Sequence, residues 1–202
     1  LLLLAYDAWG TEMVARLACL CGAARTSPWQ SVFLGGMRAL LALHDGATPA
    51  EPRVVEALAR VWAPWGLCAA FYDEGGYRAA GHDDQELFIR SYWVERLTTF
   101  RAADLAAMLD TWQSHDLATR GDGASLEEVL GRISCPTLLI QSTTDQYFRL
   151  DYAVRECELL PNARLVELDS VWGHVAGRGR VARDAAAIGA VLREHLNRGS
   201  NP

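Results

Sequence analysis

Two short apolar segments separated by a helical pattern constrain this chain more than any other feature. Residues 137–141 form an apolar run that follows Cys135-Pro136 and ends in polar residues, as a buried strand of a parallel sheet does. Residues 151–160 predict a helix, and residues 164–168 predict the next strand. Strand, helix and strand form a right-handed βαβ unit, so both strands should end at the same edge of the sheet.

An acidic residue and a histidine follow these two strands. Asp145 comes just after the first strand, and His174 lies in the turn after the second. Either residue alone is more often a helix cap or a loop residue. Together they match the order of acid and base in a Ser…Asp…His triad, in which the acid orients the imidazole and the histidine takes the proton from the nucleophile. The pair therefore predicts a catalytic role.

Four segments spread over nearly the whole chain resemble the homoserine O-acetyltransferase-like branch of the α/β-hydrolases; they are residues 16–41, 105–117, 135–148 and 160–177. The resemblance implies an α/β fold in which a parallel sheet is flanked by helices, with Asp145 and His174 as the triad acid and base. It also implies a serine nucleophile at or just before Leu1. The 202 residues contain no G-x-S-x-G motif.

The resemblance also implies three parts. Residues 1–28 belong to the α/β-hydrolase core, residues 29–130 form a large helical lid insertion, and residues 131–202 are the C-terminal part of the core with the triad acid and base. Five of the seven tryptophans lie in the insertion, where they form the core of the lid or line a hydrophobic substrate pocket. Residues 1–13 predict the end of a helix.

The fold has about eight strands, and only three are clear in this sequence. We therefore expect the C-terminal part of a longer protein that carries the nucleophile upstream. A complete protein that has lost its nucleophile is the alternative.

Two further residues bear on the substrate. Arg25 follows the strand predicted at residues 14–20 and matches an arginine near the active site of the acetyltransferases, although a solvated loop arginine is equally consistent with the pattern. Val175 follows the histidine, where homoserine O-acetyltransferases have an aspartate that binds the amino group of the substrate. Without that carboxylate, we expect an acceptor other than homoserine.

The expected function is that of an acyltransferase or esterase acting on a small-molecule acyl donor and acceptor. Acetyl-CoA is a candidate donor, and neither a bound cofactor nor a metal site is expected. The alternative is a catalytically inactive fragment that serves as a scaffold or interaction protein.

Composition excludes some partners. The net charge is −6 and the isoelectric point is about 5.4, which argues against nucleic acids and membrane surfaces. The apolar run Leu1 to Leu4 is too short to span a membrane, so a cytoplasmic location is expected. The five cysteines lack metal-binding spacing. A hydrophobic edge at the first strand favours self-association, which makes a homodimer a candidate assembly.

Overall fold

A computed structural model describes residues 10, 13–44, 51–120 and 123–197. These residues form two compact units. The sheet unit takes in the described residues of 1–25 and 116–202, and the helical unit takes in those of 26–115. The structure thus groups residues 116–130, which the sequence analysis placed in the insertion, with the sheet. The role of the insertion as a lid stays a prediction.

The described residues of the sheet unit form three parallel strands in the order β1-β2-β3. Their bounds are β1 (Leu17–Leu20), β2 (Thr137–Ser142) and β3 (Ala163–Leu168). The central strand β2 is buried along its whole length, as its apolar sequence predicts. The strand predicted at residues 14–20 begins later, at Leu17, and the Val14 N–H donates to the Gly10 carbonyl at 3.1 Å instead of pairing with β2.

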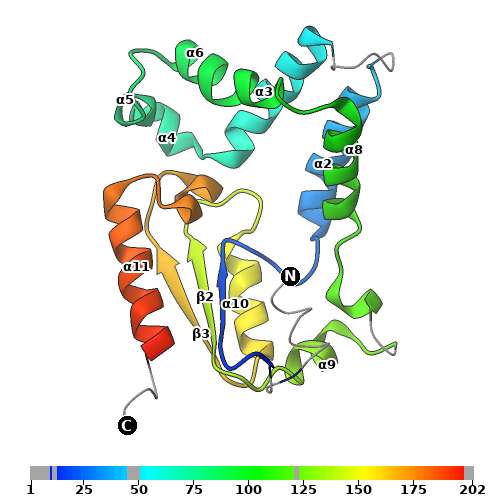
Figure 1. Cartoon of the computed structure of the whole chain (residues 1–202), viewed down its shortest axis with the longest axis vertical. Helices are drawn as coiled ribbons and strands as arrows, with labels where there is room; N and C mark the ends of the chain where they lie inside the picture. Colours follow the sequence, from blue (N-terminus) through cyan, green and yellow to red (C-terminus); the bar gives the residue numbers. More distant parts are fainter. Residues whose placement is uncertain (1–9, 11–12, 45–50, 121–122, 198–202) are drawn as a thin grey trace. The chain divides into compact units, whose positions relative to one another are not determined.

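Two helices flank these strands, and Figure 1 shows them on either side of the sheet. They are α10 (Leu150–Leu159), which connects β2 to β3, and α11 (Ala182–Asn197). The position of α10 confirms the helix predicted at residues 151–160. Three short helices complete the unit: η2 (Leu117–Arg120), α9 (Leu126–Gly131) and η3 (Gly173–Arg178).

Apolar side chains from β1, β2 and α9 form the core of the sheet unit. Leu17 and Leu139 from the strands meet Leu126, Val129 and Leu130 from α9 in one buried cluster. The α9 helix is held at its start by a capping box in which Ser125 and Glu128 exchange side-chain and backbone hydrogen bonds. The cluster lies against the sheet and holds the strands whose ends carry Asp145 and His174 in place.

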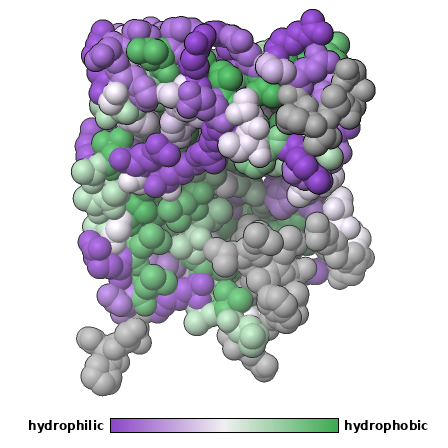
Figure 2. Space-filling model, turned by 45° about the horizontal axis from the view of Figure 1, so that its top comes forward, coloured by the Kyte–Doolittle hydropathy of each residue, from purple (hydrophilic) through white to green (hydrophobic). Residues whose placement is uncertain are grey.

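The helical unit is built around aromatic rings. Phe71 and Phe88 are fully buried, with their ring centroids 5.2 Å apart. Residues around α5 and α6 show mostly as hydrophilic in Figure 2, in keeping with an apolar interior and a polar exterior. Its elements are α2 (Pro28–Leu41), α3 (Pro52–Gly66), α4 (Ala69–Asp73), α5 (Gly76–Ala79), α6 (Gln85–Phe88), η1 (Ile89–Val94), α7 (Glu95–Leu97) and α8 (Ala102–Gln113).

The sequence of the insertion predicts breaks in its helical pattern at residues 46–52, 64–66, 75–76, 81–84 and 121–123. Those at 75–76 and 81–84 fall at the boundaries between α4, α5 and α6. The one predicted at Pro64 to Gly66 differs, because α3 continues through Pro64 and ends at Gly66. Pro64 lies close to the end of the helix, where losing one backbone donor interrupts few hydrogen bonds. The predicted breaks at residues 46–52 and 121–123, and the predicted helix end at residues 1–13, lie largely outside the described residues.

Candidate active site

Asp145 and His174 meet at the carboxyl edge of the sheet. Asp145 lies in the turn that follows β2, and His174 lies in η3, which follows β3. The Nδ1 atom of His174 is 3.0 Å from Oδ2 of Asp145. The carboxylate side chain has no solvent exposure, whereas the histidine side chain keeps 26%. The structure thus brings together the two residues that the sequence pairs, and it leaves part of the imidazole accessible.

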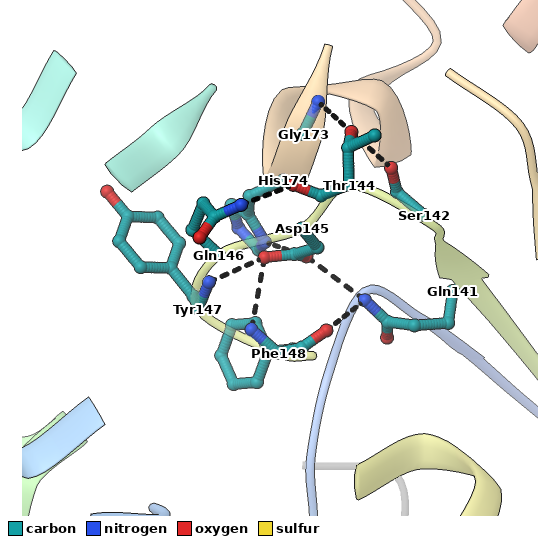
Figure 3. Close-up of polar contacts among 9 residues, drawn as sticks. All are labelled: Gln141, Ser142, Thr144, Asp145, Gln146, Tyr147, Phe148, Gly173 and His174. Atoms are coloured by element: carbon teal, nitrogen blue, oxygen red, sulfur yellow. Dashed lines mark hydrogen bonds and ion pairs between the residues drawn. The ribbon is translucent and has the colours of Figure 1, made fainter. Parts of the chain in front are cut away.

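The acid turn, residues 143–148, folds around the carboxylate of Asp145. Oδ1 accepts hydrogen bonds from the backbone N–H groups of Tyr147, at 2.8 Å, and Phe148, at 3.0 Å. Oδ2 lies 3.1 Å from Nε2 of Gln141, which donates to it, and also faces His174. Figure 3 shows these groups converging on Asp145. Because a buried carboxylate has no water to bind, these contacts satisfy its oxygens and fix their direction.

Two aromatic rings hold the imidazole of His174. The ring centroids of Tyr147 and Phe148 are each 5.2 Å from that of His174, the first edge-on and the second tilted. Tyr147 is buried, so its ring forms a fixed wall. With Nδ1 directed at the carboxylate of Asp145, Nε2 is the nitrogen left to accept a proton. This is the arrangement of a general base and its orienting acid.

The histidine loop, residues 169–178, is anchored at several points. The Ser170 hydroxyl donates to Oδ2 of the buried Asp184 on α11 at 2.6 Å, and it accepts from the Trp172 N–H at 3.2 Å. Gly173, directly before His174, has φ of 53°, which a residue with a side chain rarely adopts. These features determine the direction in which the loop presents His174.

Arg25, the predicted substrate-binding residue, lies after β1 and pairs with Asp116. Its Nε donates to Asp116 Oδ2 at 2.8 Å, and the two residues also form an antiparallel bridge. The Arg25 side chain is 43% exposed, so part of it remains accessible to a ligand. Its role in substrate binding stays a prediction.

Other nucleophilic groups near the pair are unsuited to attack. Burial, together with the nearby charge of Asp145, raises the pKa of the Cys21 thiol to about 12. Since the thiolate is the reactive form, Cys21 is inert at neutral pH. Ser142 is fully buried. Among the described residues, no group of three or more His, Cys, Asp or Glu side chains could hold a metal ion.

A groove of about 710 Å³ lies beside the acid turn, along α10. Asp145 itself contributes to its lining, although its side chain is buried, and four further charged residues line it: Arg149, Asp151, Arg155 and Glu158. His174 is not among the lining residues. The groove therefore adjoins the acid of the candidate pair, and the imidazole lies outside its lining.

Two side chains of the site were not predicted from the sequence: Gln141, which donates to Asp145, and Thr144, whose hydroxyl contacts the histidine loop. Gln141 is a buried amide at the end of a buried strand, and a polar residue in such a position usually has a specific partner. That signal was available in the sequence, but it did not identify the partner. Thr144 was one of several polar residues after β2, and nothing in the sequence distinguishes it from Thr143.

Comparisons with known proteins point to one fold. An ethyl acetate hydrolase from Pseudomonas veronii is 26% identical over 193 residues, which are 92% of this chain and 55% of that protein. The solved structure of the acetyl esterase MekB superposes with a TM-score of 0.88 at 23% identity, over 96% of this chain and 59% of its own. The solved structure of a homoserine O-acetyltransferase from Bacillus anthracis superposes with a TM-score of 0.78 at 18% identity, over 95% of this chain and 56% of its own. No family model matches the sequence.

The chain has an α/β-hydrolase fold. The fold class predicted from the sequence is therefore confirmed, and so is the resemblance to the α/β-hydrolases. The chain spans about half the length of the curated relatives it matches. In this fold, Asp145 and His174 lie after successive strands in the order in which α/β-hydrolases carry their triad acid and base.

Within the described part of the chain, none of the helices combines the length and the apolar character needed to cross a bilayer.

Proposed function

We propose that this chain carries the acid and base of an enzyme that hydrolyses esters with a small acyl group. The contact of 3.0 Å between His174 Nδ1 and Asp145 Oδ2, in an α/β-hydrolase fold, is the observation that carries the proposal. Two relatives support the choice of reaction, since one is named an ethyl acetate hydrolase and the other an acetyl esterase. The nucleophile in this proposal is a serine in a segment that precedes Leu1.

The geometry assigns each residue a step. Asp145 binds the Nδ1–H of His174, which leaves the Nε2 lone pair free to take the serine proton as the serine oxygen attacks the ester carbonyl. The imidazolium then gives that proton to the leaving alcohol, and an acyl-enzyme ester remains. Water attacks this ester while His174 again acts as the base. The carboxylic acid and the free serine result.

Transfer to another acceptor is the related reaction. The acyl-enzyme would pass its acyl group to an acceptor hydroxyl in place of water, and acetyl-CoA would be a candidate donor. Val175 bears on this choice because it is buried and apolar, so it gives no counter-charge to an amino-acid acceptor. This favours hydrolysis, or transfer to an uncharged acceptor, over acetylation of homoserine.

Hydrolysis of p-nitrophenyl acetate tests the proposal. The assay compares the 202-residue chain with a longer form of the protein that begins upstream of the predicted serine, each with and without His174→Ala. We expect activity only in the longer form, and we expect His174→Ala to abolish it. His82→Ala, which removes a histidine of the helical unit that packs against Phe88, should keep the activity. No activity in either form would favour the scaffold alternative.

Release of free CoA from acetyl-CoA distinguishes the two reactions. The proposal expects p-nitrophenol release without CoA release, both in buffer and in the presence of small alcohols. Rapid, acceptor-dependent CoA release would instead make the protein an acyltransferase that uses the same acid and base.

A further inference from the structure

The hydroxyl of Thr144 connects the acid turn to the histidine loop. Thr144 directly precedes Asp145, and its Oγ1 donates to the Ser170 carbonyl at 2.5 Å. The same oxygen accepts from the N–H of Gly173, which directly precedes His174, at 3.2 Å. Figure 3 shows Thr144 beside Gly173, with Asp145 next to it in the chain. The Thr144 side chain is thus bonded to Gly173, the residue before His174, and Thr144 is itself the residue before Asp145.

A hydroxyl group suits this connection for a chemical reason. It has one proton to donate and lone pairs to accept, so it can satisfy a carbonyl and an N–H of the same loop at once. The Ser170 carbonyl and the Gly173 N–H lie on the two sides of Trp172, which places both contacts within one turn of the histidine loop. The two hydrogen bonds of the Thr144 hydroxyl restrict both the rotation of this part of the histidine loop and its distance from Asp145.

We propose that Thr144 is a positioning residue, whose hydroxyl holds His174 at hydrogen-bonding distance from Asp145. This inference rests on the proposed function of the pair. Asp145 is fixed by its own contacts with Tyr147 and Phe148, so a change at Thr144 acts on the histidine loop. The anchors of that loop that run through the Ser170 hydroxyl do not bond to the acid turn directly before Asp145. Loss of the Thr144 hydroxyl removes two bonds from that loop and leaves Gly173 N–H to find another acceptor. The imidazole then samples positions that are too far from the carboxylate.

Four variants separate positioning from general stability. Thr144→Val has nearly the same shape without the hydroxyl, and Thr144→Ser keeps the hydroxyl without the methyl group. Thr143→Val is the matched control, because Thr143 is exposed and its hydroxyl lies 3.5 Å from its nearest acceptor, the Leu168 carbonyl. Thr144→Ala serves as a second hydroxyl-free variant if the valine methyl group prevents folding.

The measurement has two readouts. In the 202-residue chain, proton and nitrogen NMR follow the Nδ1–H of His174, which is visible only while it is held against Asp145. In the longer form, the kcat and KM for p-nitrophenyl acetate are measured. We expect Thr144→Val to weaken or remove the Nδ1–H signal. It should also lower kcat by about 10- to 100-fold with KM little changed, because small displacements of catalytic groups reduce the rate by about that factor. Thr144→Ser should restore both readouts.

The outcomes distinguish this inference from the proposed function. If His174→Ala abolishes hydrolysis while both hydroxyl-free variants keep the signal and the rate, Thr144 is not a positioning residue. The same conclusion follows if Thr143→Val has the same effect as Thr144→Val. If His174→Ala leaves hydrolysis unchanged while Thr144→Val still removes the Nδ1–H signal, the proposed function fails and the positioning role of Thr144 stands.

Discussion

Around Asp145, at the carboxyl edge of the sheet, buried polar groups meet specific partners, whereas aromatic rings dominate the packing around Phe71 and Phe88 in the helical unit. Asp145 receives hydrogen bonds at both carboxylate oxygens. In contrast, the buried hydroxyl of Tyr72 makes no hydrogen bond with any described residue, and burial raises the pKa of that group. The difference indicates where orientation matters. Directional bonds fix Asp145 and His174, while ring packing shapes and stabilises the helical unit.

The largest effect that this comparison predicts comes from removing the charge of Asp145. In Asp145→Asn, the side chain keeps its size but no longer favours the Nδ1–H tautomer of His174, so kcat for ester hydrolysis should fall on the order of 10⁴-fold. The measurement is the rate with p-nitrophenyl acetate in the longer form. Asp151→Asn, an exposed carboxylate that pairs with Arg149, is the control. An Asp145→Asn variant that retains most of its activity would remove Asp145 from the mechanism.

Ring packing in the helical unit should matter for stability and not for the site. Phe71 is fully buried against Tyr72 and Phe88, so Phe71→Ala should lower the free energy of unfolding by about 3–5 kcal/mol. Leu87→Ala, at a half-exposed position on α6, should cost much less. Denaturant unfolding gives both values. At low denaturant, the NMR signal of the His174 Nδ1–H should be the same in Phe71→Ala as in the unchanged chain. Loss of that signal would contradict the view that ring packing in the helical unit does not orient His174.

Glu156 predicts a pH dependence of stability in the sheet unit. Burial raises its pKa from 4.5 to about 7, although its Oε1 accepts a hydrogen bond from the Ala24 N–H at 2.9 Å. The folded state therefore holds this proton more tightly than the unfolded state. The resulting stabilisation is complete below a pH of about 4.5 and is lost as the pH rises to about 7.

The variant Glu156→Gln keeps an oxygen acceptor for Ala24 and has no proton to lose. Relative to the unchanged chain, it should gain on the order of 2 kcal/mol in unfolding free energy between acidic and neutral pH. Urea unfolding at several pH values measures this difference. Glu158→Gln, an exposed position on the same helix, should show no such trend. Parallel pH profiles for Glu156→Gln and the unchanged chain would show that the burial of Glu156 has no energetic consequence.

The smallest effect is expected at Arg25. Its ion pair with Asp116 is partly exposed, and such pairs contribute little, so Arg25→Gln should lower the free energy of unfolding by less than about 1 kcal/mol. The KM for the ester in the same variant tests the predicted role in substrate binding. A rise of several-fold would support that role, and an unchanged KM would leave Arg25 with its ion pair alone.

The parts of this molecule that follow from local patterns were predictable. The apolar run of β2, the amphipathic helix α10 and the strand β3 each have a clear periodicity, and parallel pairing then brings Asp145 and His174 to one edge. The contacts of Gln141 and Thr144 were not predictable, because each depends on which backbone groups the turn brings within reach. The chain returns to the sheet unit at Asp116, where an antiparallel bridge joins Asp116 to Arg25. No local sequence pattern predicts this bridge.

The central claim is that His174, oriented by Asp145, activates a serine that precedes Leu1. The most direct test is to treat the longer form with diethyl p-nitrophenyl phosphate and to locate the modified residue by mass spectrometry. The account predicts one phosphorylated serine upstream of Leu1, with a labelling rate that falls by at least about 10³-fold in His174→Ala. Labelling that is absent, or that proceeds equally fast in His174→Ala, would contradict it.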